Sequence, residues 1–88
     1  MMVAESERIV RLALAMAASD LRCAMPWQER IRLTRLLGSE TPLDVTDWQR
    51  WGCMVLTWLW ETRPTLARQV KEAVTIWRQE EALCPTRP

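Results

Sequence analysis

The chain has 88 residues, a length that suits one small domain, and we expect a single helical domain over 1–88 with a frayed tail at 83–88. Its 12 basic and 11 acidic residues give a net charge of +1, so no strong general attraction to nucleic acid or to an anionic membrane is expected. Apolar residues make up 49% and charged residues 26% of the chain, which argues against wholesale disorder.

The first predicted helix spans 4–22. Glu5 and Glu7 fall in its first turn, where the helix macrodipole favours negative charge. Apolar residues then recur at the three- and four-residue spacing of one helix face, which we expect to face the core. These residues are Val10, Leu14, Ala17, Leu21 and Ala24.

The second predicted helix spans 26–37. It begins at Pro26 because proline is tolerated at the first helical position, and Gly38 is predicted to end it as a cap in the left-handed conformation. A polar linker over 39–45 follows, in which Leu43 is expected to tuck under the domain. The apolar cluster of this helix contains Leu33, Leu36 and Leu37, with Trp27 and Ile31 beside it.

The third predicted helix starts near Thr46. Thr46 and Gln49 fit a capping box, and Asp44 is the alternative cap. From Gly52 to Trp60 the apolar residues cover almost the whole circumference of the helix. A helix of this kind lies at the centre of a core or presents one face to a partner.

Two tryptophans near the end of this helix differ in their expected orientation. Trp58 follows the stripe of Trp48, Trp51 and Val55, so we predict that it points inward. Trp60 lies about 200° from Trp58, because a helix turns about 100° per residue. We therefore expect Trp60 to be partly exposed in the monomer and covered in a dimer or complex; the alternative is that the other helices enclose it.

The fourth predicted helix runs from Pro64 to about Leu83, with its apolar face on Leu66, Val70, Ala73 and Trp77. Short connections join the four helices, and no run of residues alternates as a half-buried strand would. The sequence therefore predicts an all-α fold, a compact bundle of about four helices with the third helix central.

The composition offers little catalytic equipment. The chain has no histidine and no tyrosine, which removes the commonest general base and a common acid. Its cysteines, Cys23, Cys53 and Cys84, lack the close spacing of a zinc site, and no glycine-rich phosphate loop occurs. We therefore predict a protein that is not an enzyme and that uses no cofactor and no metal.

The chain carries no sign of export or of membrane insertion. Residues 1–6 lack the basic start of a signal peptide, and the longest apolar run, 52–60, is too short to cross about 30 Å of hydrocarbon. We expect a cytoplasmic protein with reduced thiols and no membrane partner.

Protein binding is predicted mainly by elimination. The aromatic residues are six tryptophans, and tryptophan and arginine are the residue types enriched at binding hot spots. On the third helix and at its end, the candidate contacts are Trp60, Leu56, Arg50 and Arg63. On the second helix, the candidate contacts are a predicted surface cluster of Arg30, Arg32 and Arg35.

The expected partner is a larger protein complex that the chain modulates or inhibits. Small size and the lack of catalytic residues suit a phage- or plasmid-encoded antagonist, such as an anti-CRISPR protein. A second copy of the chain is another candidate partner, since a symmetric dimer would cover Trp60 on both copies.

The alternative function is a DNA-binding transcriptional regulator that uses the basic second helix. Arg30, Thr34 and Gly38 have the spacing of the first helix of a helix-turn-helix motif. The linker before the third helix is long for that motif, however. Only Gln49 and Arg50 at the start of the third helix suit contacts with base edges.

Overall fold

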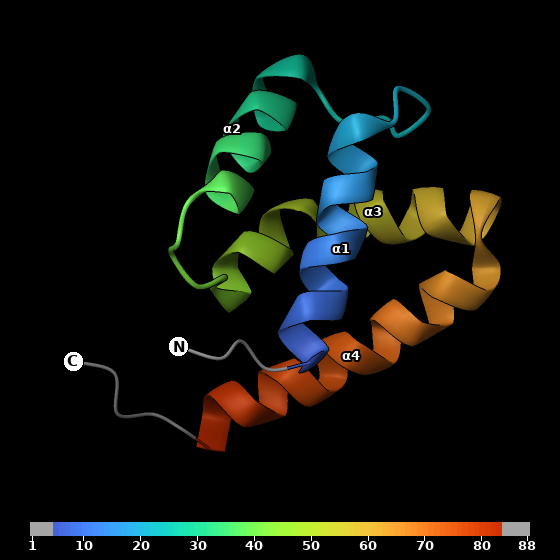
Figure 1. Cartoon of the computed structure of the whole chain (residues 1–88). Coiled ribbons are helices and arrows are strands. Elements are labelled where there is room, and N and C mark those ends of the chain that lie inside the picture. The colour runs from blue at the N-terminus through green and yellow to red at the C-terminus, as the bar shows by residue number, and fades with distance from the viewer. Residues whose placement is uncertain (1–4, 84–88) are drawn as a thin grey trace.

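The computed structural model describes residues 5–83 and consists of four helices (Figure 1). The predicted all-α fold is confirmed, and the last helix has its predicted bounds. The predicted tail after Leu83 lies outside the described residues. The helices are α1 (Glu5–Ser19), α2 (Trp27–Gly38), α3 (Val45–Thr62) and α4 (Pro64–Leu83).

The radius of gyration is 12.7 Å, close to the value of about 12 Å expected for a compact domain of this length. Within 5–83, no helix combines the length and the apolar character needed to cross a bilayer.

The helix at the centre of the fold is α1. It packs against α2, α3 and α4, whereas α3 packs against α1 and α4 (Figure 1). The prediction that the third helix is central is therefore wrong. Ala13 and Ala17 are fully buried on α1, and side chains this small let neighbouring helices approach closely. Apolar residues surround most of α3 although it is not central, and two of them, Met54 and Leu56, are only half-buried.

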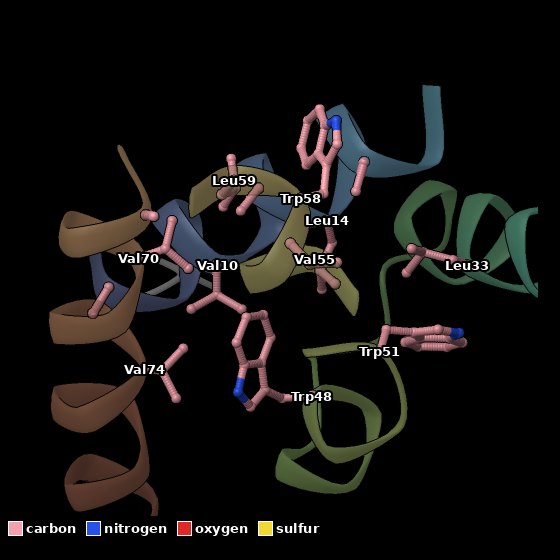
Figure 2. Close-up of a cluster of buried hydrophobic side chains, with 14 of the residues drawn as sticks. Val10, Leu14, Leu33, Trp48, Trp51, Val55, Trp58, Leu59, Val70 and Val74 are labelled. Carbon is pink, nitrogen blue, oxygen red and sulfur yellow. The ribbon is translucent and has the colours of Figure 1, made fainter. Parts of the chain in front are cut away.

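The core combines aliphatic side chains from all four helices with four buried tryptophans. Figure 2 shows that three of these, Trp48, Trp51 and Trp58, leave α3 in different directions. Trp58 is 4% exposed, which confirms that it points inward. Leu43 is fully buried, as predicted for the linker.

Asp44 caps the start of α3. Its carboxylate accepts a hydrogen bond from the Thr46 N–H at 2.9 Å, and the Asp47 carboxylate accepts one from the Asp44 N–H at 2.8 Å. This reciprocal arrangement is a capping box, built from Asp44 and Asp47 instead of Thr46 and Gln49. The alternative cap of the sequence prediction is thus the observed one.

The two glycines serve different purposes. A Cβ atom on Gly52 would lie 2.5 Å from Cε2 of Trp48, so the missing side chain makes room for that ring against α3. Gly38 is the last residue of α2, and none of the glycines among the described residues has a positive φ. The predicted left-handed cap at Gly38 is therefore wrong, and the Ser39 N–H instead bonds the Leu36 carbonyl at 3.2 Å.

Candidate functional site

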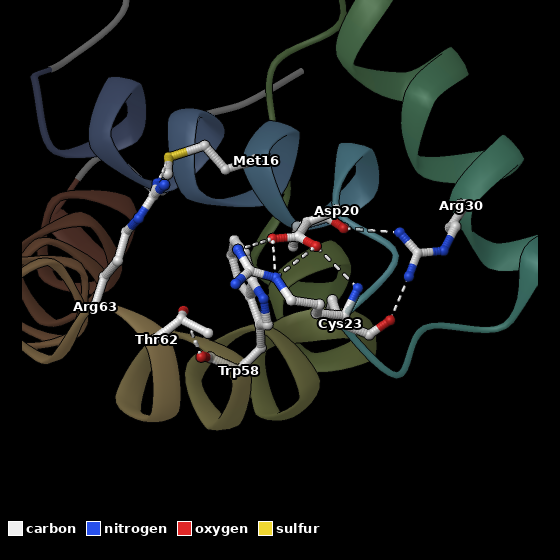
Figure 3. Close-up of polar contacts among 9 residues, drawn as sticks. Met16, Asp20, Cys23, Arg30, Trp58, Thr62 and Arg63 are labelled. Atoms are coloured by element: carbon white, nitrogen blue, oxygen red, sulfur yellow. Dashed lines mark hydrogen bonds and ion pairs between the residues drawn. The ribbon is translucent and has the colours of Figure 1, made fainter.

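Arg30, which the sequence places in a surface cluster, is only 6% exposed and points into the turn between α1 and α2 (Figure 3). Its Nε donates to the Met25 carbonyl at 3.2 Å. Its Nη1 donates to the carbonyls of Ala17 at 2.9 Å and Ala18 at 3.1 Å, and its Nη2 to that of Cys23. Because the last carbonyls of a helix lack intrahelical partners, Arg30 caps the C-terminus of α1. The predicted surface cluster is thereby reduced to Arg32 and Arg35.

The turn that follows α1 has a second fixed contact. Arg22 donates from its backbone N–H to Oδ1 of Asp20 at 2.9 Å and from Nη2 to Oδ2 at 2.9 Å. These hydrogen bonds from Arg22 lower the pKa of the Asp20 carboxyl to about 2. The turn is therefore held from both sides, by Arg30 underneath and by the Asp20–Arg22 pair at the surface.

Leu21 lies in this turn and is 83% exposed. Leu21 and Ala24 were both predicted to lie on the core face of the first helix, and both predictions are wrong, because Ala24 is exposed as well. Since α1 ends at Ser19, the helical register that would carry Leu21 to the core does not reach it.

Trp27 and Ile31 in α2 are also exposed, at 69% and 39%. Both were predicted to lie beside the apolar cluster of this helix, whereas the buried residue of that cluster is Leu33. Ile31 lies about 200° from Leu33 on the helix, given about 100° per residue. With Leu33 in the core, Ile31 must therefore face outward.

One surface hollow of about 460 Å³ is surrounded by Leu21, Trp27, Ile31 and Arg35, and its wall is completed by other residues of α1 and α2. We call these four residues the corner patch. Arg35 is exposed and forms no ion pair with any of residues 5–83. The patch thus combines three large exposed apolar side chains with a free positive charge at its edge.

The other predicted arginines of α2 and α3 share one carboxylate. Glu29 lies 3.7 Å from Nη1 of Arg32 and 3.6 Å from Nη1 of Arg50. The Arg50 guanidinium also lies 5.8 Å from the centroid of the Trp51 ring. Arg32 and Arg50 are both exposed, and the contact between Glu29 and Arg50 links α2 to α3.

The predicted contacts at the end of α3 do not all share one face. Trp60 is 45% exposed, which confirms the predicted partial exposure, and Leu56, one turn earlier, is half-buried. Arg63 lies elsewhere, with its Nη1 3.9 Å from Sδ of Met16 on α1 (Figure 3). The end of α3 therefore carries one large exposed apolar side chain, whereas the corner patch carries three.

The two described cysteines are free thiols at separate places. Cys23 is buried in the turn after α1, and this burial raises the pKa of its thiol. Cys53 is exposed on α3, and Cys84 lies outside the described residues. A buried thiol of raised pKa is a poor nucleophile, so Cys23 suits packing better than catalysis.

No family model, no curated protein and no solved structure matches the chain.

Proposed function

We propose that the chain is a non-enzymatic protein-binding module that engages a larger protein complex through the corner patch and modulates or blocks its activity. The observation that carries this proposal is the convergence of Leu21, Trp27 and Ile31 on one hollow while most of each of the first two side chains stays in solvent. Single exposed apolar residues are ordinary, whereas a contiguous group of large ones is typical of an interaction surface.

The surroundings of the patch support binding with little reorganisation. The turn that carries Leu21 is fixed by Arg30 and by the Asp20–Arg22 pair, and α2 holds Trp27 and Ile31 one turn apart. A surface ordered before binding loses less conformational entropy when a partner docks. Arg35 at the edge favours a partner with a carboxylate beside its apolar contact.

Photo-crosslinking in cells tests the proposal at residue resolution. A photoreactive amino acid replaces Trp27 in the corner patch, Trp60 on α3 or Leu12, which is an exposed apolar residue of α1 outside the patch. Apart from any product of two copies of this chain, we expect one discrete crosslinked partner protein from position 27 and none from position 12. A discrete product from position 60 alone would move the binding surface to α3 and contradict the proposal.

The DNA-binding alternative is tested in parallel with purified chain and random duplex DNA. The burial of Arg30 leaves Arg32 and Arg35 as the exposed arginines of the predicted cluster, which supports weak phosphate binding at most. Tight, salt-dependent binding that is lost on Arg32→Glu and Arg35→Glu would favour the regulator instead.

A further inference from the structure

A second hollow, of about 500 Å³, lies between α1 and α4. Its apolar part is formed by Ile9 of α1 with Ala73 and Ile76 of α4, and Ile76 is an exposed large side chain. The volume falls within the range of about 300–1,000 Å³ that is typical of binding clefts. We call this hollow the α1–α4 groove.

Carboxylates border the groove on both helices. Glu5 comes from α1, and Glu72 and Glu80 come from α4. None of the three forms an ion pair with another described residue, although Glu80 accepts a hydrogen bond from Oγ of Ser6 at 2.7 Å. An apolar groove with unneutralised negative charge at its edges suits an amphipathic helix whose polar residues are basic.

The chain itself displays a helix of this kind. On α2, Trp27, Ile31 and Arg35 are spaced four residues apart, so they form one exposed stripe that is apolar at its start and positive at its end. Arg35 has no carboxylate partner within 5–83. The stripe is thus complementary to the groove in both polarity and charge.

The stripe and the groove do not meet within one molecule, because α2 packs against α1 and makes no contact with α4. We propose that the α1–α4 groove of one copy receives the α2 stripe of a second copy, so that Trp27 and Ile31 lie on Ile9 and Ile76 while Arg35 faces Glu72. A two-fold axis would pair stripe and groove twice and give a closed dimer, whereas other arrangements would extend into longer assemblies.

This contact uses part of the surface on which the proposed function rests. A second copy and a partner protein would therefore compete for Trp27. The self-associated form is then the state of the free protein, and binding of the partner releases single chains.

Charge reversal tests the pairing with the purified full chain. Sedimentation equilibrium at low salt should show self-association that weakens as salt rises, because the charged rim is exposed. Glu72→Arg or Arg35→Glu alone should each raise the dissociation constant about tenfold or more, since both place like charges opposite each other. Glu61→Arg and Arg68→Glu are matched controls at exposed positions outside both surfaces, and they should leave the dissociation constant unchanged.

Mixing the two association-defective variants is the decisive experiment. The arginine introduced in the groove of the Glu72→Arg chain then faces the glutamate introduced on the stripe of the Arg35→Glu chain, so an equimolar mixture should associate about as tightly as the unaltered chain. Circular dichroism of each variant verifies that the fold is retained.

Three outcomes would overturn the pairing. They are a monomer up to about 1 mM, no recovery on mixing, or self-association that depends on Trp60 and ignores both charge reversals. A chain that stays monomeric yet crosslinks to a host protein from position 27 would overturn self-association while leaving the proposed function standing.

Discussion

A single buried guanidinium organises the region that carries the corner patch. Arg30 donates to the carbonyls of Ala17 and Ala18 at the end of α1 and to those of Cys23 and Met25 in the turn behind it. The carbonyls of Ala17 and Cys23 also accept from backbone N–H groups, those of Asp20 and Met25. An unsatisfied buried carbonyl costs about 1–3 kcal/mol, so loss of the Arg30 donors to Met25 and Ala18 together would outweigh most single contacts in a domain of this size.

Replacing Arg30 by methionine keeps most of the apolar stem and removes every donor. We expect Arg30→Met to lower the free energy of unfolding by about 3 kcal/mol or more, as measured by urea denaturation. Arg32→Met is the matched control, because that side chain is exposed, and its effect should stay within about 0.5 kcal/mol. Equal effects of the two variants would show that Arg30 does not cap α1.

The Asp20–Arg22 contact makes stability depend on pH. The pKa of Asp20 is about 2 in the folded chain against an ordinary value of 3.8, so its ionised form is favoured by folding. That stabilisation is present above pH about 4 and is lost as the pH falls toward about 2. In urea denaturation, Asp20→Asn should therefore be less stable than the unaltered chain at pH about 6, and the gap should close by pH about 2. A gap of constant size would contradict this assignment.

At the scale of one helix, packing in α3 depends on the fit between a glycine and an adjacent tryptophan ring. Gly52→Ala adds a Cβ that meets Trp48 at 2.5 Å, so the ring must move out of its position in the core. We expect a net loss of about 1–3 kcal/mol in unfolding free energy, despite the better helix propensity of alanine. Gly38→Ala has nothing within 4 Å of its new Cβ and a negative φ, so it should be neutral or stabilise by up to about 1 kcal/mol. The opposite ranking in thermal melts would refute this account of Gly52.

The two tryptophans near the end of α3 should respond differently to truncation. Trp58→Ala removes a side chain that is almost wholly buried and should cost about 3–5 kcal/mol of unfolding free energy. Trp60→Ala removes one that is almost half exposed, so the monomer should stay folded with a clearly smaller loss. If both variants melt equally early, Trp60 belongs to the core after all.

At the scale of the whole molecule, helix periodicity predicted the four helices, and proline predicted the start of α4. The extent of apolar residues around a helix did not predict which helix is central. A helix at the edge also carries apolar residues when one of its faces is left half-buried. The fully buried alanines of α1 were the better guide, because small residues mark close helix contacts.

The corner patch was only partly predictable. The position of Ile31 opposite Leu33 follows from the helical period alone, and it indicates an outward side chain. The exposure of Leu21 depends on where α1 ends, and that depends on an arginine that comes from the next helix to cap it. A tertiary contact of this kind leaves no local pattern in the sequence of α1.

Binding through the corner patch is measured by the affinity of the protein captured at position 27 for a chain that carries Trp27→Ala and Ile31→Ala together. Calorimetry should show a dissociation constant at least about 30-fold higher, the equivalent of about 2 kcal/mol for a hot spot, while the helical circular dichroism spectrum is retained because both side chains are exposed. Leu12→Ala, measured in the same way, should bind like the unaltered chain. Undiminished affinity of the double variant would contradict the account, since the corner patch would then not be the surface that binds.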